Sequence, residues 1–314
     1  MSAAKAKIAD IEANNAAADA ASDARAEMQA RTAEPKLVPA NDTAPDAAPA
    51  AKKGKAAVTA PVKDAWDRFQ IDVWVTNFNS VEFGIYQNTK NKAKSRQFTT
   101  DMDIIAEITE AGERTGVLGY REDLWGKNTG MDKRLVFKLF GEKLNWHATM
   151  DFMVARSLQL TIGARGLPVT AFSLNTGDHH QMVYLERSAN KWPFSPEDFS
   201  FFLIEDGKAE FYRLRRDIFA LGRDYTLYDQ TGAVVGHLDG KLLSIGGKWK
   251  GKVLNTGHDK RLKMVLKLFC AMLIFNRGAR RHVSQLYRQV RAGKIVPKIE
   301  KQEADLYMNP RRVR

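Results

Sequence analysis

The chain has 314 residues, a net charge of +12 and a single cysteine, Cys270. One cysteine excludes an internal disulfide, and no apolar signal segment opens the chain, so we expect a cytoplasmic protein. The charge is uneven, because residues 277–314 hold 11 Lys and Arg against 3 Asp and Glu. Such a basic tail indicates an anionic partner, or a solvated tail that only aids solubility.

The N-terminal region differs in composition from the rest of the chain. Residues 1–60 contain 23 alanines and no aromatic residue, so they have little with which to build a core. We therefore expect a disordered Ala/Pro-rich arm and linker over 1–63. A folded domain over 64–296 and a basic tail over 297–314 complete the expected organisation.

Residues 69–75 alternate apolar with polar and predict a half-buried β-strand, which a strand at 81–86 follows. Two short apolar runs within 104–120 predict two more strands, and 152–172 holds further candidates. Ala111-Gly112 and Thr115-Gly116 separate the two runs of 104–120, as a hairpin turn does. Residues 192–196 contain two prolines and predict a connector, since neither a helix nor a central strand tolerates them.

Several predicted hairpins follow each other between 217 and 253. Tyr225–Tyr228 leads into the turn Asp229–Gly232, in which Gly adopts the left-handed conformation. A returning strand, 233–238, reaches Asp239-Gly240, a strong two-residue hairpin signal. Further strands are expected at 241–245 and 248–253. This pattern predicts an antiparallel meander in a curved sheet or barrel.

Residues 264–275 are apolar except for Lys267. A helix that is apolar on every side must be surrounded by protein, and this run is shorter than the roughly 20 residues that span a bilayer. We therefore predict a buried central helix over 262–276. The stem of Lys267 is expected to follow apolar surface while its ammonium reaches a barrel mouth or an acidic partner.

Asn276-Arg-Gly278 is expected to break that helix, so that a second, basic amphipathic helix covers 279–292. Its apolar face contains Val283, Leu286, Tyr287 and Val290, and arginines lie along its flank. Two interpretations remain open. The helix either docks on the fold through its apolar face, or sets that face in a membrane surface with arginines on lipid phosphates.

An internal repeat joins the two halves of the folded domain. Residues 128–135 return as 255–262 with a single difference, and flanking matches keep their order. This predicts two related halves, each with a helix that starts at Asp-Lys-Arg-Leu and with Lys138 and Lys267 in equivalent places. Free N–H groups at helix starts bind anions, and Lys and Arg in these two starts could add to such a site. The resulting candidates, which rank below the basic helix, are Lys133, Arg134, Lys260 and Arg261. The alternative is a capping Asp beside solvated cations.

Residues 211–245 resemble the LURP-one-related proteins, through a strand, an Asp-x-x-Gly turn and a returning strand. These proteins share the tubby-like barrel with the phospholipid scramblases. The resemblance implies a mainly β protein, with a closed antiparallel barrel of about a dozen strands around a buried hydrophobic C-terminal helix. Tubby domains bind phosphoinositides through basic residues, but their positions do not map onto this chain one by one. The calcium-site segment and the cysteine cluster of scramblases are not visible, so lipid translocation is not expected.

Catalytic patterns are scarce in this sequence. It contains no P-loop, dinucleotide fingerprint or Gly-x-Ser-x-Gly elbow. Asp178-His179-His180 has no second ligand pair at a suitable spacing, so ordinary loop histidines are expected there. Cys270 lies in the apolar helix and is interpreted as a small buried side chain. We expect a protein that is not an enzyme, with no cofactor and no metal.

These observations predict a lipid-binding or membrane-peripheral barrel that recognises anionic phospholipid surfaces. A protein-interaction scaffold or assembly component, using the N-terminal arm and the basic tail, is the alternative. Nucleic-acid binding ranks third, because few aromatic residues accompany the basic tail. The expected location is the cytoplasm, with peripheral attachment to a membrane and no transmembrane segment. The expected anion-binding residues are Arg277, Arg280, Arg281, Arg288, Arg291 and Lys294.

Overall fold

The structure of the chain is a computed structural model. It describes residues 66–73, 97–99, 102–177, 181–190, 196–205, 207–217, 223–241, 247–255 and 260–308. The predicted N-terminal arm, the predicted strand at 81–86 and the 192–195 part of the predicted connector lie outside these residues.

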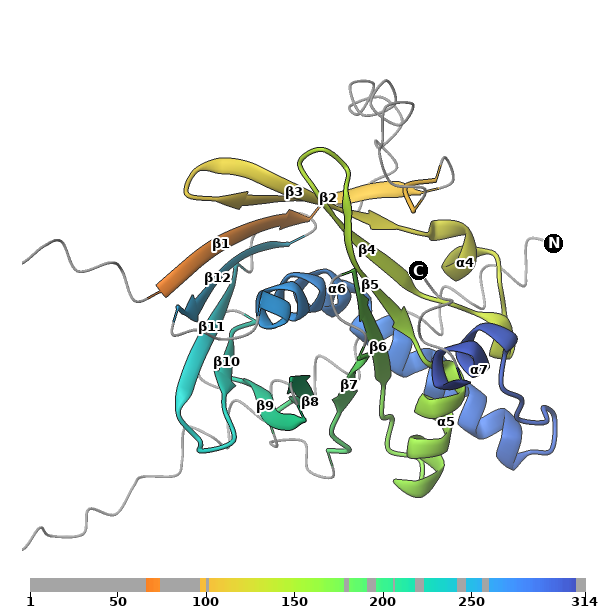
Figure 1. Ribbon diagram of the computed structural model, residues 1–314. Coiled ribbons are helices and arrows are strands. Elements are labelled where there is room, and N and C mark those ends of the chain that lie inside the picture. The colour runs from red at the N-terminus through yellow and green to blue at the C-terminus, as the bar shows by residue number, and fades with distance from the viewer. Residues whose placement is uncertain are drawn as a thin grey trace, which may run out of the picture. The chain divides into compact units, whose positions relative to one another are not determined.

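The described strands form a closed antiparallel barrel in which each strand pairs with the next along the chain (Figure 1). Pairing of β1 with β12, from Trp66 opposite Leu254 to Asp72 opposite Lys248, closes the ring and leaves no free edge. The predicted closed antiparallel barrel is thereby confirmed. The strands are β1 (Trp66–Val73), β2 (Asp103–Glu110), β3 (Glu113–Tyr120), β4 (Val136–Gly141), β5 (Trp146–Phe152), β6 (Ala171–Thr176), β7 (Val183–Arg187), β8 (Asp198–Glu205), β9 (Lys208–Arg216), β10 (Tyr225–Tyr228), β11 (Val234–Lys241) and β12 (Lys248–Leu254).

Four α-helices accompany the barrel in the described residues. They are α4 (Glu122–Gly126), α5 (Val154–Gly163), α6 (Lys260–Arg291) and α7 (Lys301–Met308). In Figure 1, α6 enters the ring of strands and its second half leaves on the side where α5 and α7 lie. The helices α5 and α6 contact each other there.

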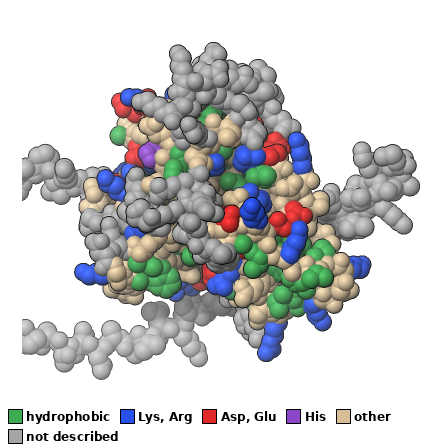
Figure 2. All heavy atoms as spheres, turned by 45° about the vertical axis from the view of Figure 1, so that its right-hand side comes forward, with side chains coloured by type: hydrophobic (Ala, Val, Ile, Leu, Met, Phe, Trp, Pro, Cys, Tyr) green, Lys and Arg blue, Asp and Glu red, His purple; other side chains and the backbone are tan. Residues whose placement is uncertain are grey.

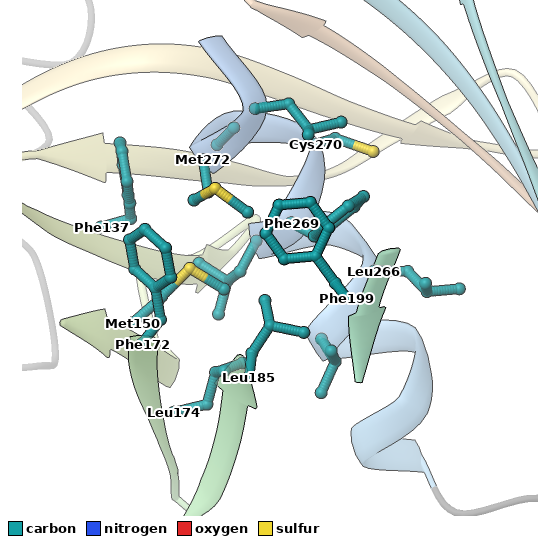
Figure 3. Packing of buried hydrophobic residues seen from close by; sticks show 14 of the residues in the cluster. Phe137, Met150, Phe172, Leu174, Leu185, Phe199, Leu266, Phe269, Cys270 and Met272 are labelled. Carbon is teal, nitrogen blue, oxygen red and sulfur yellow. The ribbon is translucent and has the colours of Figure 1, made fainter. Parts of the chain in front are cut away.

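The first half of α6 is packed against the inner wall of the barrel. Val265, Leu266 and every residue from Leu268 to Leu273 are at most 4% exposed. Figure 3 shows Phe269, Cys270 and Met272 of α6 among inward side chains of the strands, including Phe137, Phe172 and Phe199. The Phe269 ring lies edge-on to Phe199 at 5.0 Å between centroids. Helix and wall therefore share one hydrophobic core.

The predicted break at 276–278 is wrong, because α6 is one helix of 32 residues. The predicted helices 262–276 and 279–292 are its two halves. A glycine in a helix interior, such as Gly278, lowers the stability of the helix by only about 1 kcal/mol relative to alanine. Ala279, Val283 and Leu286, all buried, continue the packed face beyond it and offset that cost. Tertiary packing therefore decides against the local helix-breaking signal.

The strand candidates within 152–172 are also partly wrong. Only the ends of this segment are strands, β5 and β6, and α5 occupies the centre. The buried residues of α5 are Val154, Ser157, Leu158 and Thr161, which follow a helical spacing. Beyond its end, Gly166 has φ +91° and lies under the Tyr287 ring, where an added Cβ would come within 2.5 Å.

Two of the three predicted hairpin turns are confirmed. Ala111 and Gly112 join β2 to β3 with positive φ at both residues, whereas Thr115 and Gly116 of the predicted separation lie within β3. The Asp229 carboxylate accepts hydrogen bonds from the Thr231 and Ala233 N–H groups and closes the β10–β11 turn. Asp239-Gly240 is not a turn, because both residues belong to β11 and pair with β12. The predicted strand at 241–245 falls mostly outside the described residues.

The sequence repeat does not correspond to repeated structure. The first copy forms a 3₁₀ turn, Gly130–Asp132, and runs into strand β4, whereas the second runs into α6. The predicted helix at Asp132 is therefore absent. Lys138 lies in β4 and donates to Gln97, while Lys267 lies in α6 and donates to Glu110, as predicted for an acidic partner. The chain after the first copy is extended because β4 pairs with β3 on one side and with β5 on the other.

Candidate functional site

Four of the predicted arginines form one exposed row on the second half of α6. Arg277, Arg281, Arg288 and Arg291 follow each other at spacings of 4, 7 and 3 residues, which places them on one side of a helix. All four are exposed. We call this row the basic stripe.

The opposite side of α6 is not available for a membrane surface. Val283 and Leu286 are fully buried against the fold, and Tyr287 and Val290 pack at the margin of the same core. Of the two interpretations of this apolar face, docking on the fold is therefore the correct one.

Arg280 does not belong to the basic stripe. Its guanidinium turns inward to Glu197, at 3.8 Å. The same carboxylate accepts hydrogen bonds from Arg187, Asn276 and Tyr225. Burial raises the pKa of Glu197, but the charge of Arg187 and the hydrogen bonds from Arg187, Asn276 and Tyr225 together hold that pKa below its usual value. This cluster ties α6 to the barrel.

The weaker anion-binding candidates divide into structural and exposed residues. Arg134 forms an ion pair with the buried Asp151, and Arg261 is 1% exposed and donates to the Ile204 carbonyl at 2.8 Å. Lys133 lies over the Trp125 ring at 4.4 Å, and Lys260 is exposed at the start of α6. Arg134 and Arg261 therefore serve the fold, and the structure does not bring the four together as one site.

Three large apolar side chains are exposed near the end of α6. They are Ile162 of α5 at 46%, Val296 at 83% and Ile299 at 60% exposure. Ile162, Pro297 and Ile299 line one groove of about 450 Å³ between α5 and the segment after α6. We call Ile162, Val296 and Ile299 the apolar tip. The pair of apolar residues Val296 and Ile299 could have indicated this tip from the sequence, but the prediction considered only the positive charge of this segment.

The apolar tip is held in place by defined contacts. The Glu303 carboxylate of α7 accepts hydrogen bonds from the Ala155 and Arg156 N–H groups, at 2.9 and 2.8 Å. These donors are free N–H groups of the first turn of α5. Lys298 donates to Asp132 at 2.7 Å, between the two apolar residues of the tail. The segment after α6 is thereby attached at two points to the rest of the fold.

Exposed cations follow the same two helices that border the apolar tip. Arg165 follows α5, Lys294 follows α6, and both are exposed. Figure 2 shows hydrophobic side chains grouped among Lys and Arg on the face formed by α5 and the end of α6. The basic stripe runs toward this tip along α6, so apolar and cationic groups share one end of the molecule.

Of the residues considered for chemistry, Cys270 is the one within the described part of the chain. Cys270 is completely buried, and burial raises the pKa of its thiol, which disfavours the thiolate. It is thus a packing residue, as predicted. Asp178, His179 and His180 lie outside the described residues.

No described helix is long and apolar enough to cross a bilayer. Comparison with protein-family models, with curated proteins and with solved structures found no match to the chain.

Proposed function

We propose that the protein binds anionic phospholipid surfaces peripherally and without catalysis, through the apolar tip and the cations around it. The observation that carries this proposal is the exposure of Ile162, Val296 and Ile299 beside exposed Arg and Lys side chains. Exposed apolar groups of this kind enter the boundary between headgroups and acyl chains, and cations bind the phosphates.

The two kinds of contact reinforce each other. Stable peripheral attachment generally takes two weak signals, such as an apolar insertion and a basic patch. A Lys or Arg near an anionic membrane contributes about 1 kcal/mol. The basic stripe and Lys294 thus supply a long-range attraction, and Val296 and Ile299 supply the short-range one.

The proposed relation to tubby-like barrels has separate support. The closed barrel of twelve strands and the buried first half of a C-terminal helix match what the resemblance of residues 211–245 implies. We keep this relation as part of the proposal.

A protein-interaction scaffold is the second candidate, and the outer wall of the barrel favours it. Phe202 of β8 is 54% exposed and packs on Phe211 of β9, with ring centroids 5.0 Å apart. Ile204 is exposed beside them. This apolar patch lies on strands, away from the apolar tip. Substitutions in the patch and substitutions in the tip can therefore test protein interaction and membrane binding separately.

Vesicle sedimentation tests the proposal. The full chain should bind vesicles that contain anionic phospholipid and should bind neutral phosphatidylcholine vesicles weakly. Replacing Val296 and Ile299 with Asp should abolish binding, because insertion would then bury charge. Phe202→Ser is the matched control for an exposed apolar residue and should bind as the wild type does.

A second set of variants tests the charges. Replacing Arg281, Arg288 and Arg291 with Gln should weaken binding by about 1 kcal/mol per charge, or roughly a hundredfold together. The matched control replaces Lys208, Lys241 and Lys250, three exposed lysines of the barrel wall. Equal losses in both sets would show a non-specific effect of net charge, and no loss in either would refute the proposal.

A further inference from the structure

A second candidate site lies at the other end of α6, inside the barrel mouth. A cavity of about 500 Å³ opens between the first turns of α6 and the inner wall of the barrel. We call it the mouth cavity. Its apolar wall includes Ile108, Leu139, Val253, Leu262 and Met264. Its volume is in the range of cavities that hold small ligands, which are mostly apolar with a few polar groups.

The polar groups of the mouth cavity form one cluster. Glu110 of β2 accepts hydrogen bonds from Lys263, at 2.7 Å, and from Lys267. Lys263 also lies 3.8 Å from Asp67. Lys267 is mostly buried, so its ammonium has lost much of its hydration. A desolvated cation interacts more strongly with a nearby anion than a cation in water does.

Cations exceed anions in this cluster. Among the described residues, the cavity is lined by Lys260, Lys263 and Lys267 against Asp67 and Glu110, which leaves one positive charge in excess. An ammonium carries three N–H donors, and among the described residues the Lys267 ammonium donates only to Glu110. The cluster therefore has both the charge and the donors for one more carboxylate.

We infer that the mouth cavity binds a single-chain carboxylic acid, with its carboxylate on Lys263 and Lys267 and its acyl chain against Leu139, Leu262 and Met264. The cavity combines an apolar wall with one cationic corner, and an amphiphile with one chain and one negative charge complements both. This site shares no residue with the basic stripe or the apolar tip, so it is independent of the proposed membrane surface.

Calorimetric titration of the full chain with decanoate, below its micelle threshold, tests the inference. Saturable binding of one decanoate per chain is expected, with decanol at least tenfold weaker, because a charge-assisted hydrogen bond is lost. Acetate should not bind measurably, because it lacks the chain. Equal affinities for decanoate and decanol, or no saturable binding, would overturn the inference.

Two variants of the cluster should act in opposite directions. Lys267→Met, which keeps the stem and removes the charge, should weaken decanoate binding about tenfold or more. Glu110→Gln should strengthen it, because a competing carboxylate is removed. If Lys267→Met does not fold, Lys263→Met replaces it with the same expectation. Decanoate affinity that is unchanged in the lysine variant, or weaker in Glu110→Gln, would refute the assignment.

Control variants separate this site from the membrane surface. Lys250→Met removes an exposed lysine of β12 outside the cavity and should leave decanoate affinity unchanged. The Val296 and Ile299 Asp variant should also bind decanoate normally. Loss of decanoate binding in either control would place the ligand elsewhere, and failure of vesicle binding alone would leave the mouth cavity supported.

Discussion

Phe269 lies in the part of the core that the barrel and α6 share. It is completely buried, and its ring meets Phe199 and Tyr225 edge-on, with centroids 5.0 and 5.1 Å away. Such edge-to-face pairs add to the free energy of burial. Phe275, one and a half turns later, is only partly buried and contacts Tyr120 at 4.8 Å.

Truncating these two rings should therefore have unequal effects. Phe269→Ala should lower the free energy of unfolding by about 3–5 kcal/mol, because it leaves a cavity in a closed core. Phe275→Ala should cost less, since its surroundings can rearrange at the margin. Denaturant unfolding of both variants measures the difference, and an equal or reversed order would contradict this account of α6.

Glu197 couples stability to pH. Because its pKa is held below the usual 4.5, its contribution to stability is present above pH 4.5. That contribution is lost as the pH falls through the lower pKa of the folded state. Glu197→Gln should cost about 3–5 kcal/mol at neutral pH, because Arg187 is left buried without its anion. The difference in unfolding free energy between wild type and variant should shrink in acid, and a constant difference would contradict this origin.

Helix α6 continues through Gly278 because its packing outweighs the low helix propensity of glycine. Gly278 lies in the middle of this helix, and an added Cβ would be 3.4 Å from the Trp125 ring, an ordinary contact. Gly278→Ala should therefore raise the free energy of unfolding by about 0.5–1 kcal/mol. Gly232→Ala is the control, since Gly232 has φ +84° and its replacement should destabilise the turn. Destabilisation by Gly278→Ala, measured by thermal unfolding, would indicate a break in the helix.

At the scale of the whole molecule, β1 determines whether the barrel is closed. It pairs with β12 on one side and with β2 on the other. Its removal would expose two strand edges and one side of the core.

Two truncations test this role of β1. A chain that begins at Pro61 keeps β1 and should melt at the same temperature as the full chain, because residues 1–60 have no aromatic side chain to contribute to a core. A chain that begins at Val75 lacks β1 and should lose its cooperative unfolding transition. Calorimetry of both chains measures this, and a clear loss of stability in the first would show that the arm packs on the barrel.

Local patterns in the sequence predicted most of the strands and the position of the apolar helix. Alternation marks β1, because it has one face toward the core and one away from it, whereas β3 is buried on both faces from Gly116 to Tyr120. The prediction of strand for 154–163 is wrong because a short apolar run fits a strand or a helix equally well. The packing of this segment on α6 selects the helix. The apolar tip was missed because exposure depends on which neighbours cover a side chain.

Patterns along the chain predict an antiparallel meander in a curved sheet or barrel, the buried apolar helix segment and the excess of positive charge near the C-terminus. These follow from periodicity and composition, which act locally along the chain. Only the tertiary structure decided that α6 continues through Gly278, that Arg261 and Arg280 turn inward and that Arg281 and Arg288 stay outside. The reason is that a cation's role depends on whether a carboxylate, a carbonyl or water lies within reach, and residues distant in sequence, such as Glu197 and Ile204, provide those partners.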